Sequence, residues 1–249
     1  MKFTITHELT YSYDSPVRLS TQYLRLTPRD TTRQKVLAWK LETAGQAMRT
    51  SDGYGNILHV LTLDKPVSEI SIEVAGTVQT SPVVDEPSDF TGAPLPPQLF
   101  LRTTALTRVD DKLAALAARF AGADLSGLRE LSAAIRKADG ESSAADLAHS
   151  FIASCRHIEV PARYVSGYVY AGESKSSASR NMTMHAWAEA WIGERWRSFD
   201  VADDRPIGES HVKIAVGADY LDACPIRGVR VGGGNETLVA RAQVKATQQ

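Results

Sequence analysis

The first third of the chain alternates between polar and apolar residues with a period of two. Residues 1–13 (MKFTITHELTYSY) show the alternation, and residues 36–44, 57–65 and 68–80 repeat it. Asp52-Gly53 and Gly55-Asn56 supply the residues that favour tight turns between such segments. We therefore expect residues 1–85 to form an N-terminal antiparallel β-sandwich.

The pattern breaks after this region. Residues 81–102 contain five of the eleven prolines, which exclude an uninterrupted helix or an inner strand. We expect residues 86–105 to form a Pro-rich linker that lies over a surface. From residue 106 the apolar spacing becomes helical, and residues 106–122 and 125–138 are rich in Ala and Leu.

A third helix is predicted over residues 144–158. Its apolar residues form one stripe: Leu147, Phe151, Ile152, Cys155 and Ile158. Ser143 and Asp146 have the spacing of a capping box, so we expect Ser143 to cap the helix at its N-terminus.

Strand patterns return after this helix, at residues 162–172, 185–192 and 195–201. Helices followed by strands indicate an α+β class, which we assign to residues 106–249. Gly193-Glu194 is a plausible two-residue turn between the last two of these strands. In that register Asp200 faces Trp187 and lies diagonal to His185 on the same face. The carboxylate can then orient the imidazole and leave its second nitrogen free to act as a base.

Composition narrows the possible functions. The 249 residues are 43% hydrophobic and 23% charged, values typical of a soluble globular protein. A net charge of −1 argues against nucleic acid or an anionic membrane as partner. There is no signal-peptide pattern and no membrane-length apolar run.

Two cysteines indicate reduced thiols and a cytoplasmic location rather than a disulfide framework. Clusters typical of metal ligands are absent, and we predict no metal and no cofactor; the oligomeric state stays open.

Two segments resemble the core of bacterial transglutaminase-like proteins: CRHIEVPARYVSGYVYAG, at residues 155–172, and MHAWAEAWIGERWRSFDVAD, at residues 184–203. The segments YSYDSPVRLSTQYLRLTPRD and DGYGNILHVLTLDKP resemble the β-rich region that precedes these cores, and residues 211–234 resemble the tail that follows them. The resemblance implies a papain-like fold, helices packed on an antiparallel sheet, with a Cys-His-Asp triad whose thiolate attacks an amide.

The resemblance assigns the base to His185 and the orienting acid to Asp200. Its nucleophilic cysteine belongs at the start of the third predicted helix, within SSAADLAH, and the residue at that position is Ala144. Ser142 replaces the family's glycine, and the approach AIRKADGESS is shorter than in the family. Both differences favour natural loss of the nucleophile.

We therefore expect a catalytically degenerate pseudoenzyme that binds a protein, peptide or isopeptide substrate in the former active-site cleft. The first alternative is a cysteine peptidase, amidase or transglutaminase acting on amide bonds, whose cysteine was replaced by Ala144. The second is a hydrolase that uses Ser143. Cys155 lies eleven residues along the same helix, about 16 Å away along its axis, and is expected to be a buried structural thiol.

Several weaker features complete the prediction. Ser143 and Trp187 are candidate cleft residues, although aromatic residues such as Trp187 and Trp191 more often pack inside a sheet. His149 is expected to pack its helix rather than bind a metal. Residues 228–237 (GVRVGGGNET) lack the context of a phosphate loop and indicate a hairpin tip.

Overall fold

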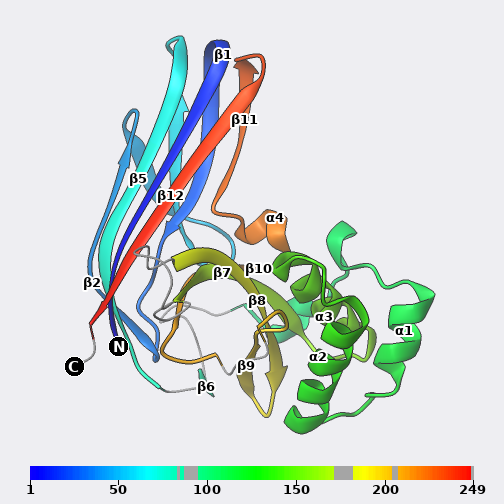
Figure 1. Ribbon diagram of the computed structural model, residues 1–249. Helices are drawn as coiled ribbons and strands as arrows, with labels where there is room; N and C mark the ends of the chain where they lie inside the picture. The colour runs from blue at the N-terminus through cyan, green and yellow to red at the C-terminus, as the bar shows by residue number, and fades with distance from the viewer. Residues whose placement is uncertain (83–84, 87–94, 171–181, 204–206, 248–249) are drawn as a thin grey trace.

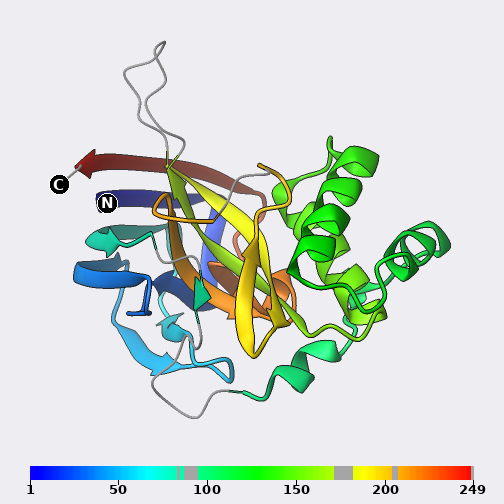
Figure 2. The same cartoon turned by 90° about the horizontal axis from the view of Figure 1, so that it is seen from below.

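The protein is described here by a computed structural model that covers residues 1–82, 85–86, 95–170, 182–203 and 207–247. Two antiparallel sheets and a group of helices make up these ranges. Figures 1 and 2 show a large curled sheet on one side, a smaller sheet in the middle, and the helices beyond the smaller sheet. Within the described ranges, no helix is both long enough and apolar enough to cross a membrane.

The large sheet has seven strands in an arrangement centred on β1. Its path is β2-β5-β1-β4-β3, and two C-terminal strands, β11 and β12, also pair with β1. The bounds are β1 Lys2–Thr27, β2 Gln34–Thr43, β3 Ala47–Ser51, β4 Ile57–Leu63, β5 Val67–Thr80, β11 Ile226–Gly232 and β12 Glu236–Thr247. The first half of β1 lies between β12 and β5, and its second half lies between β11 and β4.

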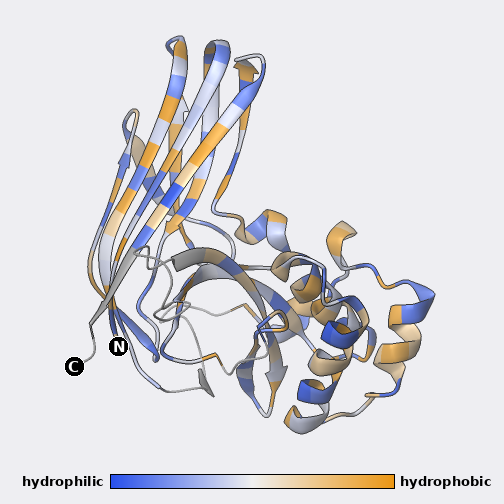
Figure 3. Cartoon of the chain, in the orientation of Figure 1, coloured by the Kyte–Doolittle hydropathy of each residue, from blue (hydrophilic) through white to orange (hydrophobic). Residues whose placement is uncertain are grey.

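The expected sandwich is replaced by this single curled sheet. Alternation along each strand predicts one buried face, and Figure 3 shows alternating hydrophilic and hydrophobic bands on the long strands. That face is covered in two ways. The curled sheet encloses its own cluster around Leu24, Leu61 and Ile72, and Phe3, Ile5 and Val78 pack against the second half of the chain. No second sheet is needed to bury it.

The division expected at residues 106–249 does not follow the sheets at its C-terminal end. β11 and β12 belong to the large sheet, and Lys2 and Thr247 are paired. The glycine-rich sequence at residues 228–237 predicts a hairpin tip but carries no information on the partner of the strands that flank it. Their connection is a hairpin in which Gly232, Gly233 and Gly234 all have positive φ angles, as expected for the glycine-rich tip.

The second half begins with two short 3-10 helices, η1 Pro97–Leu101 and η2 Ala105–Thr107. Residues 87–94 of the expected linker lie outside the described residues. The part that is described packs on the core, because Phe100 is buried and its carbonyl oxygen accepts a hydrogen bond from the Arg156 Nε at 2.8 Å. The segment from Pro97 onward is therefore attached to the core surface.

The predicted helices are present as α1 Asp111–Ala118, α2 Leu125–Asp139 and α3 Ala144–His157, followed by a short α4 Tyr220–Ala223. The smaller sheet has the order β10-β7-β8-β9-β6. Its strands are β6 Asp85–Glu86, β7 Ala162–Tyr170, β8 Met182–Ile192, β9 Arg195–Phe199 and β10 His211–Gly217. α3 packs against β7 and β8, and this contact positions the helix N-terminus beside the candidate site.

Hydrogen bonds tie the large sheet to the core. The Gln34 Nε2 donates to the Lys213 carbonyl oxygen at 2.8 Å, and the Asn56 Nδ2 donates to the Val216 carbonyl oxygen at 2.7 Å. The Nδ1 of His7 lies 2.9 Å from the Tyr168 hydroxyl. Because all three contacts involve buried groups, they fix the two parts against each other.

Candidate functional site

A tight hairpin brings the predicted base and acid together. β8 and β9 are joined at Gly193 and Glu194, both with φ near +60°, as in a type I′ turn. The register pairs Ala188 with Phe199, as the sequence predicts. Asp200 follows directly after β9, and its Oδ2 lies 2.9 Å from the His185 Nε2. The carboxylate is therefore the hydrogen-bond partner of Nε2, and the other ring nitrogen, Nδ1, is left to form a hydrogen bond with a group in the site.

The Asp200 carboxylate has two further donors. Its Oδ2 lies 3.1 Å from the His211 Nε2, and its Oδ1 accepts a hydrogen bond from the Asp203 backbone N–H at 3.2 Å. Burial raises the pKa of Asp200, but the hydrogen bonds from His185 and His211 lower it more, so the net pKa lies below its ordinary value. The carboxylate is therefore ionised at neutral pH.

His211 is the site residue that sequence reasoning missed. It begins β10 and is fully buried, and its Nδ1 lies 3.0 Å from the Ser210 hydroxyl. Burial lowers its pKa despite the opposing effect of Asp200. The only sequence signal is a histidine at the start of the apolar segment HVKIAVG, and nothing in that segment indicates a contact with Asp200.

The N-terminus of α3 forms the opposite part of the site. The Ser143 hydroxyl oxygen accepts a hydrogen bond from the Asp146 backbone N–H at 3.2 Å, and the hydroxyl donates to the Asp146 carboxylate at 2.6 Å. This is the predicted N-cap, and Ala144 is the first residue of the helix. The helix dipole and the free N–H groups of its first turn are directed at this position.

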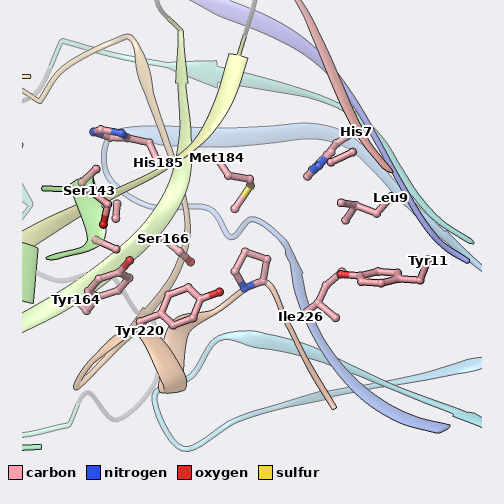
Figure 4. Close-up of a pocket in the computed structure, with 15 residues that line it drawn as sticks. His7, Leu9, Tyr11, Ser143, Tyr164, Ser166, Met184, His185, Tyr220 and Ile226 are labelled. Atoms are coloured by element: carbon pink, nitrogen blue, oxygen red, sulfur yellow. The ribbon is translucent and has the colours of Figure 1, made fainter. Parts of the chain in front are cut away.

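Ala144 and His185 line one cavity of about 450 Å³. The cavity lies between the first half of β1 and the core, and Figure 4 shows His185 and Ser143 on one side of it and His7, Leu9 and Tyr11 of β1 on the other. Most of its walls are apolar or aromatic, with contributions from Tyr164, Met184, Tyr220, Pro225, Ile226 and Ala240. No cysteine is among the residues that line it.

Trp187 lies outside this cavity, unlike Ser143. Its side chain is fully buried and packs with Val165, Ile207 and Val216. The ring stacks on His185 at a centroid distance of 6.4 Å and meets His211 edge-on at 5.4 Å. Period-two alternation places Trp187 on the same strand face as His185 but does not show which side chains of that face reach the opening. Trp187 therefore packs against the two histidines and does not line the cavity.

Both cysteines are free and buried. Cys155 is in the core cluster between α3 and the sheet, and burial raises the pKa of its thiol far above the ordinary value. Burial also raises the pKa of Cys224, whose Sγ lies 3.6 Å from the Leu221 carbonyl oxygen. Both thiols are therefore protonated at neutral pH and are poor nucleophiles.

His149 packs in α3. Its ring stacks on Tyr164 at 4.9 Å, and its Nε2 accepts a hydrogen bond from the Tyr220 backbone N–H at 3.1 Å. Among the described residues, one group brings metal-ligating atoms within 4.8 Å of each other, namely His185, Asp200 and Asp203. Its His185–Asp200 contact is already a hydrogen bond, and Asp203 is exposed.

A buried charge network stabilises the strand that carries His185. Glu189 is fully buried, and its carboxylate lies 2.6 Å from the Arg163 Nη2 and 2.5 Å from the Lys213 Nζ. The Arg163 guanidinium also stacks over the Trp196 ring at 3.9 Å. Two cations compensate the charge of one carboxylate in this network. Because the three residues lie on β7, β8 and β10, the network also links these strands.

Two family models match the chain. The bacterial transglutaminase-like N-terminal region matches residues 3–79, and the transglutaminase-like superfamily matches residues 112–201. The second match includes Ala144, His185 and Asp200.

A solved structure shares the fold of this chain, and curated proteins are similar to it in sequence. A crystal structure from Cytophaga hutchinsonii, named "Putative Cysteine Protease", has a TM-score of 0.73 and 24% identity, covering 100% of this chain and 91% of that one. At this identity the likeness shows the fold alone. The uncharacterized protein ML0607 of Mycobacterium leprae is 29% identical, covering 95% of this chain and 96% of the relative. The uncharacterized protein Rv2569c of Mycobacterium tuberculosis is 26% identical, covering 92% and 87%.

Proposed function

We propose that this protein is a catalytically silent transglutaminase-like protein that binds an amide-bearing peptide segment, or an isopeptide, in the cavity between Ala144 and His185. The observation that carries the proposal is the residue at the start of α3. A methyl group takes the position next to the cavity where the resemblance requires a thiol, while the base and the acid keep a 2.9 Å hydrogen bond.

The geometry supports binding without chemistry. With Asp200 accepting from Nε2, the Nδ1 of His185 has a lone pair that can accept a hydrogen bond from an amide N–H. The free N–H groups in the first turn of α3 can donate to a carbonyl oxygen. Apolar and aromatic walls then bury the flanking side chains of the peptide.

The competing reading is an enzyme whose cysteine was replaced by Ala144, and one observation favours it. The His185–Asp200 pair and the helix N-terminus line a single open cavity rather than a collapsed one. The serine alternative is weaker, because the Ser143 hydroxyl already donates to Asp146 and accepts from its backbone N–H. A nucleophilic serine needs that proton to be transferred to His185.

The test is turnover and binding measured side by side. Wild type and Ala144→Cys are incubated with glutamine-containing peptides, with and without a primary amine, and release of ammonia and product masses are recorded. We expect no turnover by the wild-type protein, and binding of the same peptides measured by calorimetry. Turnover by wild type that is lost in Ser143→Ala would instead support the serine hydrolase. Full turnover by Ala144→Cys would support the replaced-cysteine enzyme.

A further inference from the structure

The cavity continues along the large sheet. Paired residues lie on one face of a sheet, so Leu9 and Ala240, Tyr11 and Leu238, and Tyr13 and Glu236 form successive steps away from His7 on the face that looks toward the core. Figure 1 shows β1, β11 and β12 extending far beyond the core in this direction. Leu238 is 49% exposed and Tyr220, at the cavity, is 41% exposed, so this path is open to solvent.

A second pocket of about 230 Å³ lies on the same path. It shares Tyr11 and Ile226 with the first cavity, and its other lining residues are Tyr13, Ser20, Gln22, Gly228, Val229, Arg230 and Glu236. From His7 to Tyr13 the strand rises about 3.3 Å per residue, which gives roughly 20 Å for the two cavities together. An extended peptide of about six residues has this length.

The second pocket has one buried hydrogen-bond acceptor without a partner among the described residues. Gln22 is 7% exposed, and its Oε1 has no hydrogen-bond partner among the described residues, while its Nε2 donates to the Ser20 hydroxyl at 3.4 Å. An unpaired buried carbonyl costs about 1–3 kcal/mol unless a ligand or water donates to it. Gly228, which pairs with Gln22 across the sheet, has no side chain to cover it.

The charged groups of the pocket also favour a ligand that donates hydrogen bonds. The guanidinium of Arg230 is engaged within its own hairpin, since it donates to the carbonyl oxygens of Gly232 and Gly234 and lies 5.0 Å from the centre of the Tyr13 ring. The Glu236 carboxylate is 38% exposed and lies 3.5 Å from the Arg230 Nε, a long contact. Burial, and then Glu236, raise the pKa of Tyr13 to about 12, so its phenol stays neutral beside the carboxylate.

We propose that the two cavities form one groove for an extended peptide, and that the second pocket selects a lysine four to six residues from the residue seated at His185. The ammonium would donate to the Gln22 Oε1 and the Glu236 carboxylate, and its methylene chain would lie on the Tyr11 ring. This inference rests on the proposed function, since the peptide is held at its other end in the cavity beside Ala144.

The probe is a library of N-acetylated, C-amidated octapeptides in which one position at a time is fixed as Lys, norleucine or Glu. Four proteins are compared with wild type: Ala240→Trp, which fills the first cavity; Gln22→Leu and Glu236→Gln, which remove the two acceptors; and Glu8→Gln, a control on the other face of β1. Circular dichroism verifies that each variant is folded.

We expect wild type to bind Lys peptides about tenfold more tightly than their norleucine matches at one spacing, as one charge-assisted hydrogen bond would provide. Gln22→Leu and Glu236→Gln should remove that preference, and Glu8→Gln should keep it. Two outcomes would overturn this inference and leave the proposed function standing. In the first, peptides bind wild type and not Ala240→Trp, but without any preference for Lys. In the second, the Lys preference persists in Glu236→Gln. Failure of every peptide to bind, or binding that survives Ala240→Trp, would contradict the proposed function as well.

Discussion

Replacing Asp200 by Asn tests whether the carboxylate holds the site together. The Asp200 side chain is fully buried, and its three donors are the imidazoles of His185 and His211 and the Asp203 backbone N–H. An amide of the same shape has one acceptor oxygen instead of two and carries no charge. Both imidazoles contact Oδ2, so an amide that turns its oxygen toward them leaves the Asp203 N–H without an acceptor, and the remaining hydrogen bonds become neutral.

The magnitude follows from these contacts. A hydrogen bond to a charged group contributes about 1.5–3 kcal/mol, and a neutral one contributes about 1 kcal/mol. Losing one charged bond and weakening the other two should lower the free energy of unfolding by about 3–6 kcal/mol at pH 7. Asp64→Asn, in an exposed turn after β4, is the matched control and should change the free energy by less than about 0.5 kcal/mol.

The deficit should depend on pH. The folded-state pKa of Asp200 lies below its ordinary value, so its contribution is fully present above about pH 4 and is lost as the pH falls further, by about 1.4 kcal/mol per pH unit. Asp200 also raises the pKa of His211, so the deficit should increase slightly between pH 7 and pH 5. Urea unfolding followed by tryptophan fluorescence at pH 7, 5 and 3 measures all three values. A deficit below about 1 kcal/mol, or one that is equal at each pH, would refute this reasoning.

Three further predictions concern residues around the site. Ser143→Ala removes the N-cap of α3 and should lower stability by about 1 kcal/mol while leaving peptide affinity within about twofold, measured by urea unfolding and calorimetry; a complete loss of binding would contradict a purely capping role. Glu189→Gln leaves Arg163 and Lys213 as buried, partly uncompensated cations and should cost about 3–5 kcal/mol in the same unfolding assay; a neutral effect would show that the network is dispensable. Cys155 should react with a thiol reagent only as fast as the protein unfolds, and rapid labelling of the native protein would show that its burial is wrong.

Locally encoded features could be predicted from the sequence. The capping box at Ser143 and the apolar stripe of α3 depend on residues within one helix, and the structure places both as expected. The β8–β9 hairpin depends on two turn residues, which fix the register and bring Asp200 to His185. These short-range signals were sufficient because the turn type alone sets which residues face each other.

Contacts between distant segments could not be predicted in this way. The glycine-rich sequence at residues 228–237 predicts a hairpin tip, but only the folded chain shows that the flanking strands pair with β1 and contribute to the cavity. His211 approaches Asp200 from β10, and no local pattern links the two residues. Trp187 was proposed as a cleft residue because strand periodicity separates two faces, whereas exposure depends on what packs against each face.

The central claim is that the cavity keeps the base His185, the acid Asp200 and the N-terminus of α3 in place and lacks the thiol at residue 144. The most direct test is the pKa of the thiol introduced by Ala144→Cys, obtained from the pH dependence of its alkylation rate, with Ala145→Cys as a matched control on the same helix and cavity. We predict a pKa well below the 8.5 or so of a free cysteine for Ala144→Cys, lost on adding His185→Asn, and an ordinary value for Ala145→Cys. An ordinary or raised pKa for Ala144→Cys, unaffected by His185→Asn, would contradict the account.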